Sequence, residues 1–175
     1  MIESEDICLR ALEPEDVEML YKWENDMKLW TVSNTHTPFS RHQLKRYIEH
    51  ANLDLFQTKQ LRLVIDICLE DKKTSIGLID LFDFDPFHNR GGIGIIIHEN
   101  YRGKGWAFKA LETFILYCFE HLGLHQLYAN ISENNTPSIK LFESCGFEIT
   151  GRKKQWRKTP QGYLDELLLQ KINCK

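Results

Sequence analysis

The fold is decided by the stretch Ile93-Gly94-Ile95-Ile96-Ile97-His98-Glu99-Asn100-Tyr101-Arg102-Gly103-Lys104-Gly105-Trp106-Ala107. Its Ile-rich half predicts a strand that is buried on both faces, in the middle of a sheet. A turn with two glycines follows and opens a helix, whose first N–H groups have no partner inside the helix and can bind an anion. Glycine lets the backbone approach a phosphate closely, and Arg102 and Lys104 add positive charge. The turn matches neither the P-loop nor the Gly-x-Gly-x-x-Gly motif, so taken alone it is also compatible with an ordinary glycine turn.

The patterns on both sides of this stretch define the element order. Strands are expected over 7–12, 61–69, 75–84, 92–98, 124–131, 147–156 and 163–170. Helices are expected over 13–25, 41–56 (with Ser40 as N-cap), 104–122 and 137–144, with an irregular segment over 27–39 and a polar turn at 71–73. This order predicts one α/β domain of the α+β kind over residues 1–175, with a mixed, mostly antiparallel sheet of about six to seven strands flanked by about four helices.

Composition excludes several classes of protein. The chain has 175 residues, is 42% hydrophobic and carries a net charge of −3, which argues against disorder and against a dedicated nucleic-acid binder. It has no apolar run of about 18 residues, so no membrane span is expected, and its acidic start is unlike a signal peptide. The five cysteines are widely spaced, which favours neither a metal site nor a disulfide framework. We therefore expect a cytoplasmic protein.

A second motif lies at Asn135-Thr136-Pro137-Ser138-Ile139-Lys140-Leu141-Phe142-Glu143-Ser144-Cys145-Gly146-Phe147, directly after an expected strand. With it, the chain resembles the GNAT superfamily of acetyl-CoA-dependent N-acetyltransferases. The family's pyrophosphate motif, Gln/Arg-x-x-Gly-x-Gly/Ala, matches Arg102, Gly105 and Ala107. Its later motif matches Asn135, Ser138, Leu141, Phe142, Gly146 and Phe147. The order and spacing of both motifs fit, and the closest resemblance is to ribosomal-protein N-terminal acetyltransferases and spermidine N-acetyltransferases.

The resemblance implies a set of residues for acetyl-CoA. The backbone of Ile95, Ile96 and Ile97 is expected to pair with the pantetheine arm, and one N–H group to stabilise the oxyanion that develops at the thioester. The expected pyrophosphate cradle consists of Arg102, Gly103, Lys104, Gly105, Trp106 and Ala107. Asn135, Ser138 and Phe142 complete the expected set.

The acid–base residues are harder to assign. The chemistry needs a group that accepts the amine proton, and the resemblance implies direct attack on the thioester without a covalent enzyme intermediate. However, the family's tyrosine proton donor falls at Phe142, and a glutamate common on the central strand falls at Gly92. The candidates that remain are Asp80, Asp83, Asp85, His36 and His88, from which we select His88 and Asp83, because His88 has the most suitable unperturbed pKa.

The acceptor is expected to bind between segment 27–39 and the hairpin near 155–163, with Trp30, Phe39 and Trp156 as an apolar wall. It is a primary amine, either on a small molecule such as a polyamine or at a protein N-terminus. The paired acids expected of spermidine enzymes are missing from Ser33-Asn34-Thr35-His36, which counts against a polyamine. A non-catalytic acyl-CoA-binding module and an unrelated nucleotide-binding domain are the alternatives, and homo-oligomer formation is left open.

Overall fold

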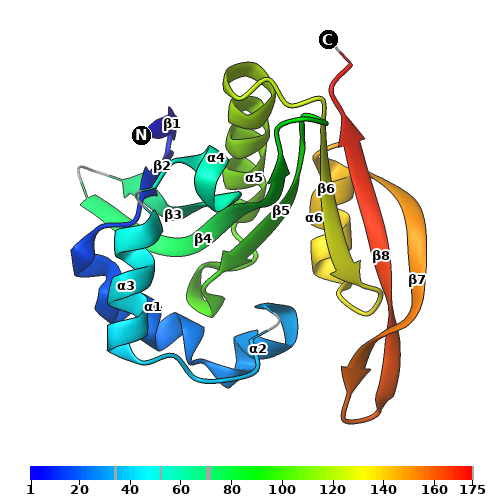
Figure 1. Cartoon of the computed structure of the whole chain (residues 1–175), viewed down its shortest axis with the longest axis horizontal. Helices are drawn as coiled ribbons and strands as arrows, with labels where there is room; N and C mark the ends of the chain where they lie inside the picture. The colour runs from blue at the N-terminus through cyan, green and yellow to red at the C-terminus, as the bar shows by residue number, and fades with distance from the viewer. Residues whose placement is uncertain (34, 52, 70–71, 175) are drawn as a thin grey trace.

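The computed structural model describes residues 1–33, 35–51, 53–69 and 72–174. In these residues the strands form one eight-stranded sheet in the order β1-β2-β3-β4-β5-β6-β8-β7 (Figure 1). The strands are β1 (Ile2–Ser4), β2 (Ile7–Ala11), β3 (Leu61–Leu69), β4 (Lys72–Asp85), β5 (Arg90–Ile97), β6 (Gln126–Ser132), β7 (Glu148–Thr159) and β8 (Gly162–Ile172). Neighbouring strands are antiparallel apart from the β5–β6 pair.

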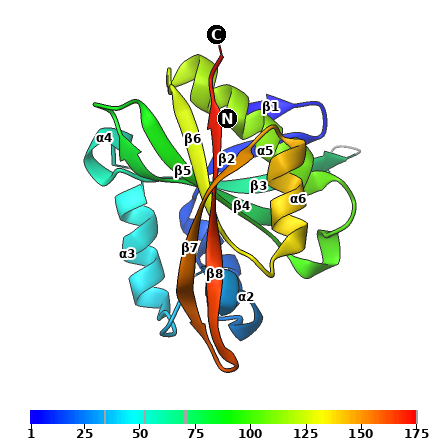
Figure 2. The ribbon, with the colours of Figure 1, turned by 90° about the vertical axis from the view of Figure 1, so that its right-hand side faces the viewer.

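Helices cover both faces of the sheet. They are α1 (Val17–Glu24), α2 (Met27–Ser33), α3 (Arg41–Ala51), α4 (Leu55–Thr58), α5 (Trp106–Leu116) and α6 (Thr136–Ser144). Figure 2 shows α3 on one side of the sheet and α5 and α6 on the other. The larger apolar core lies under α5 and α6, and a smaller one joins α1 and α3 to Val64, Leu78 and Ile96. Within the described residues no helix combines the length and apolarity that crossing a bilayer requires.

The sheet and most of its strands follow the sequence-based prediction, and the differences are two short elements that were not predicted and several element boundaries. The short β1 was not predicted; it pairs with β2 and makes the sheet one strand wider. Segment 27–39 is not irregular throughout, because α2 occupies Met27–Ser33. The helix expected over 41–56 ends at Ala51, and Asp54 caps the separate α4 by accepting from the Phe56 N–H.

Boundaries around α5 and at the start of β4 also differ from the prediction. The helix expected from residue 104 begins at Trp106, because Gly105 is its N-cap with a φ of +82°. That helix changes at Tyr117 into a wider turn over Tyr117–His121, before Gly123. Of the polar turn expected at 71–73, Lys72 and Lys73 belong to β4, and Asp71 lies outside the described residues.

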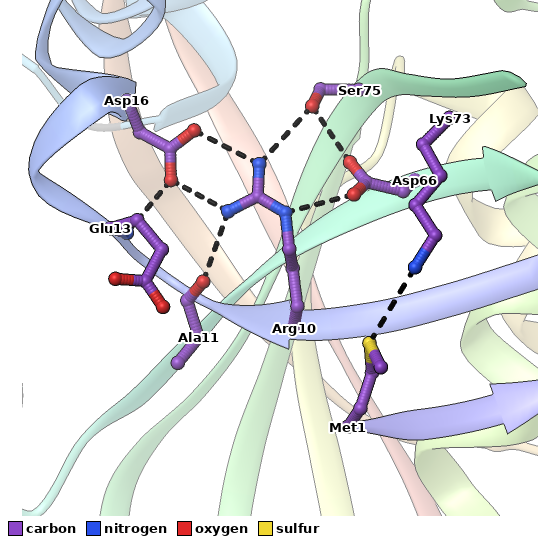
Figure 3. A network of polar contacts seen from close by, with 8 residues as sticks. All are labelled: Met1, Arg10, Ala11, Glu13, Asp16, Asp66, Lys73 and Ser75. Atoms are coloured by element: carbon purple, nitrogen blue, oxygen red, sulfur yellow. Dashed lines mark hydrogen bonds and ion pairs between the residues drawn. The ribbon is translucent and has the colours of Figure 1, made fainter.

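An ion-pair network joins the start of α1 to the sheet. Arg10 on β2 donates to both carboxylate oxygens of Asp16, at 2.7 and 2.9 Å, and to Asp66 at 2.8 Å. Ser75 also donates to Asp66, so the guanidinium is enclosed on three sides (Figure 3). Asp16 and Asp66 are only 8% and 3% exposed, and a buried carboxylate needs such partners. The network therefore fixes how the chain leaves β2 and enters the helical layer.

Candidate active site

The central feature is the separation of β5 from β6. The two strands pair over three residue pairs, from Arg90–Gln126 to Gly92–Tyr128, and then diverge. Figure 1 shows them side by side at one end and apart at the other. A cleft of about 890 Å³ lies at this separation, lined by Gly94 to Ile96 on one side and by Asn130 to Ser132 on the other. The sheet itself thus provides a binding site in its middle.

Beyond Gly92, the edge of β5 that faces the cleft has no strand partner among the described residues. The His98 N–H donates to the Ile76 carbonyl of β4 at 2.8 Å. Because antiparallel ladders alternate, residues 94 and 96 then also bond to β4, while Ile95 and Ile97 point their N–H and carbonyl groups to the other side. Ile95 therefore turns its backbone groups toward the cleft, whereas the backbone groups of Ile96 bond to β4 and its side chain packs against the smaller core.

The turn after β5 has the form of an anion site. Gly103 and Gly105 have φ values of +72° and +82°, and a Cβ built on either would have no atom within 4 Å. The backbone at both glycines is therefore open to a ligand. The N–H groups of Trp106, Ala107 and Phe108 precede the first helical hydrogen bond, from Lys109 to the Gly105 carbonyl.

Two basic side chains hold this turn in place. Arg102 donates from Nε to the Ile97 carbonyl at 2.7 Å, which ties the turn to the end of β5. Lys104 donates to the Asn100 carbonyl at 3.0 Å. Both residues are exposed, so they add positive charge near the amides while they shape the turn.

The start of α6 forms the opposite wall of the cleft. Asn135 caps the helix by accepting from the Ser138 N–H at 3.3 Å, which leaves the two donors of its amide group for the cleft. Phe142 is 3% exposed and packs edge-on against Phe147 with 5.0 Å between ring centroids. Asn135, Ser138 and Phe142 all line the cleft, together with Gly94 to Ile96 of β5. Ile97 and the predicted cradle residues 102–107 are not among the residues that line it.

One polar cluster, the Arg62 cluster, lies on the β3–β4 side of the cleft and consists of Arg62, Glu24 and Asp80. Arg62 donates to Asp80 at 2.5 Å and to Glu24 at 2.7 Å. Burial opposes the charge of Arg62, but the neighbouring carboxylates outweigh burial and raise its pKa above its ordinary value. The arginine therefore stays charged and neutralises part of this wall.

A second cluster, the Glu166 cluster, lies on the β7–β8 side and consists of Glu166, Lys153 and Arg157. Glu166 is 4% exposed and accepts from Lys153 at 3.1 Å and from Arg157 at 3.0 Å. Lys153 also donates to Asn130 Oδ1 at 2.8 Å. All of these residues line the cleft, as does Ser132.

Comparisons with known proteins agree with this geometry. The model of the acetyltransferase (GNAT) domain matches residues 6–148. The uncharacterised N-acetyltransferase p20 of Bacillus licheniformis is 30% identical, over 93% of this chain and 90% of that protein. Spermidine N(1)-acetyltransferase of Vibrio cholerae is 27% identical, over 83% of this chain and 80% of that protein. A crystal structure of spermidine N-acetyltransferase from Vibrio cholerae, in complex with CoA and spermine, has the same fold, with a TM-score of 0.86 and 24% identity over 97% of this chain and 96% of that chain.

The chain belongs to the GNAT acetyltransferase family. The predicted fold class is confirmed, and so is the predicted activity, the transfer of an acetyl group from acetyl-CoA to an amine.

The two catalytic candidates of the acetyltransferase lie in different places. His88 is exposed in the turn between β4 and β5, where its N–H donates to Asp85, and it is not among the residues that line the cleft. Asp83 lines the cleft at an irregular point of β4, with a φ of +49°. Its carboxylate accepts from the Tyr128 hydroxyl at 3.1 Å.

The structure also explains why residue 92 carries no acid. A Cβ at Gly92 would lie 2.3 Å from the Phe82 ring, so a side chain there requires the ring to move. Phe82 in turn packs edge-on against Tyr128 with 5.8 Å between centroids. The side chains nearest to this position are therefore aromatic, and Asp83 is the next residue along β4.

Of the side chains expected at the acceptor wall, some line the cleft and one does not. Phe39, Trp156 and His36 line the cleft, whereas Trp30 donates its indole N–H to the Glu24 carbonyl at 2.7 Å. The Arg62 and Glu166 clusters were missed. Their residues come from distant segments, and isolated charges in the sequence carry no signal that they will meet.

Proposed function

We propose that this acetyltransferase modifies a small primary amine by direct attack on the thioester of acetyl-CoA. The observation that carries the proposal is the backbone edge of Ile95, which has no strand partner on the side of the cleft within the part of the chain that the structure describes and lies seven residues before the glycine turn begins. A thioester arm paired with this edge has its carbonyl beside a main-chain N–H, which stabilises the charge that develops there. In this arrangement residues 102–107 hold the pyrophosphate, and Asn135 and Ser138 contact the pantetheine.

For the amine proton we propose Asp83 rather than His88. An alkylamine has a pKa of roughly 10.4 and needs a proton acceptor, directly or through one water, before it can attack. Asp83 lines the cleft, and the hydrogen bond from Tyr128 orients its carboxylate. Burial, together with the nearby Asp83 carboxylate, raises the pKa of Tyr128 to about 12, so its hydroxyl remains a donor.

Two measurements test the proposed function. Acetyl-CoA at about 100 times its Kd is expected to add roughly 2.7 kcal/mol of stability, which raises the Tm by about 5 to 10 °C, while ATP and NAD leave it unchanged. Thiol release is then measured with a panel of primary amines, with a secondary amine and an alcohol as controls. Release with the primary amines alone supports the proposal, and a Tm that responds to ATP or NAD instead contradicts it.

Phe142 and Gly92 stand where the family resemblance implies a tyrosine and a glutamate, so the acid–base groups of this enzyme differ from those that the resemblance implies. An acetyl-CoA Tm shift without thiol release for any amine would contradict the proposal.

We also propose that the protein forms homo-oligomers and works in the cytoplasm. Large apolar side chains are exposed on the β7–β8 hairpin at the edge of the sheet: Ile149, Trp156, Tyr163 and Ile172. Light scattering at several concentrations tests the association. The five cysteines are free thiols, which suits a reducing compartment.

A further inference from the structure

The two polar clusters give the cleft walls of opposite character. The β3–β4 wall holds two carboxylates around one arginine in the Arg62 cluster, and Asp83 adds a further carboxylate nearby. The β7–β8 wall holds two cations around one carboxylate in the Glu166 cluster. One side of the cleft thus has negative charge in excess and the other has positive charge in excess.

Lys153 is the central group of the positive wall. Its ammonium has three N–H donors, of which one bonds to Glu166 and one to Asn130. Asn130 Oδ1 accepts the hydrogen bond from Lys153, so the N–H groups of the Asn130 side chain remain available to a ligand in the cleft. The wall therefore presents hydrogen-bond donors from both residues next to the excess positive charge.

Ser132 supplies an independent observation on the same wall. Ser132 lines the cleft at the end of β6, and the residue is 9% exposed. Among the described residues its hydroxyl has no hydrogen-bond partner. A buried hydroxyl without a partner is costly, and a ligand that accepts a hydrogen bond would satisfy it.

The negative wall does not offer a row of unneutralised acids for a polycation. Asp80 and Glu24 both bond to Arg62, and Glu166 is neutralised from the other side. A ligand with several ammonium groups would have to displace these contacts and would meet the repulsion of Lys153. An amine that also carries an anion would find complementary charge on both walls.

We infer that the acceptor is a small amine that carries a carboxylate, with the carboxylate bound by Lys153, Asn130 and Ser132 and the amine directed toward Asp83 and the thioester. The inference rests on the proposed function and specifies its substrate class. Lys153 is the specificity-determining residue, because it turns a general amine site into one that prefers an amino acid over a diamine.

The test uses amines that differ only at the end remote from the reacting nitrogen. Glycine, 3-aminopropanoate and 4-aminobutanoate are each compared with their amides, and 4-aminobutanoate also with 1,4-diaminobutane and spermidine. Thiol release gives kcat/KM for each. For at least one chain length, kcat/KM for the carboxylate is expected to exceed that for its amide by about 10- to 100-fold, the effect of one lost charge-assisted hydrogen bond.

In Lys153→Met, the ratio of kcat/KM for the carboxylate to kcat/KM for its amide is expected to fall close to one, mainly because KM for the carboxylate rises. Lys153→Arg is expected to restore part of the preference for the carboxylate. Because both substrates are measured on the same preparation, the ratio does not depend on how much of the variant is folded. Lys154→Met is the matched control: it removes the same charge from an exposed neighbour on β7 and should leave the ratio unchanged.

The outcomes that overturn the inference differ from those that overturn the proposed function. Faster release with spermidine or 1,4-diaminobutane, or equal rates for every carboxylate and amide pair, would refute the inference and leave the proposed function in place. Acetylation of peptide N-termini alone would refute both the inference and the proposal of a small amine. An equal fall in kcat/KM for the carboxylate and for its amide in Lys153→Met would also refute the inference. Absence of thiol release with every amine refutes the proposed function itself.

Discussion

The donor side and the acceptor side of the cleft are built in different ways. On the donor side the binding groups that we propose are backbone amides: the edge of β5, the turn at Gly103 and Gly105, and the first residues of α5. On the acceptor side the proposed binding groups are ionised side chains from α1, β3, β4, β7 and β8. A backbone site needs only a correct local conformation, whereas a side-chain site depends on how distant segments pack. Side-chain changes on the acceptor side should therefore leave acetyl-CoA binding unaltered, and changes in the glycine turn should leave the preference among amines unaltered.

The largest effect is expected at Gly105. In Gly105→Val the side chain occupies the space above the turn, so two or three amide hydrogen bonds to the pyrophosphate are lost. At about 1.5 to 3 kcal/mol each, their loss weakens acetyl-CoA binding by about 1000-fold. Isothermal titration calorimetry measures it.

Gly123→Val is the control for this change. Gly123 also has a positive φ, of +66°, and open space around its Cβ position, but it lies in the turn before β6. Both variants carry the same backbone strain, so a similar loss of stability is expected. Equal acetyl-CoA affinity in the two variants would show that the turn at Gly105 does not bind the pyrophosphate.

The next largest effect is expected for the proposed proton acceptor. Asp83→Asn keeps the size of the side chain but removes its basicity, so kcat should fall by about 100-fold with little change in acetyl-CoA affinity. Asp85→Asn, two residues along β4 at the turn that holds His88, should keep most of kcat. A His88→Gln variant that loses more activity than Asp83→Asn would reverse the assignment.

This division between the two sides also explains what the sequence could predict. The donor side was predictable because each part is local: an Ile-rich strand, a turn with two glycines and a helix follow one another in 15 residues. The two motifs then identified Asn135, Ser138 and Phe142, which lie on the same cleft as Ile95. The boundary at Trp106 could not be predicted, because it depends on the left-handed conformation of Gly105.

The acceptor side was predicted only in outline. Segment 27–39 and the β7–β8 hairpin do border the cleft, but the Glu24–Arg62 ion pair joins residues 38 positions apart, and Lys153 reaches Asn130 across 23. Such contacts follow from strand order and register, which the sequence pattern does not fix. The same limit explains why β1 and α2 were missed, since both are short elements held by their neighbours.

A moderate effect on substrate preference is expected when the β3–β4 wall loses its neutralising arginine. Arg62→Gln removes the charge that neutralises Asp80 and Glu24, so the wall should bind a second ammonium group. We expect kcat/KM for 1,4-diaminobutane to rise relative to 4-aminobutanoate by about 10-fold, the effect of roughly 1.4 kcal/mol. Arg10→Gln is the control, because Arg10 also lies between two carboxylates but outside the cleft (Figure 3). A similar shift in both variants would mean that general loosening, and not local charge, changes the preference.

The smallest effect on activity is expected at Asp16, where the consequence should be confined to stability. Burial raises the pKa of Asp16, but the hydrogen bonds from Arg10 and from the Glu13 N–H outweigh it, so the pKa lies below its ordinary value of 3.8. The stabilisation is therefore complete above that value and is lost as the pH falls through the lowered pKa of the folded state. At pH 7, Asp16→Asn should lower the free energy of unfolding by about 2 kcal/mol. In urea titrations this difference in the free energy of unfolding should shrink only below about pH 3.8. The ratio of kcat/KM for the carboxylate substrate to that for its amide should stay at the wild-type value. A variant that alters this ratio at pH 7 would show that the Arg10 network reaches the acceptor wall, and that the two sides of the cleft are less independent than their construction implies.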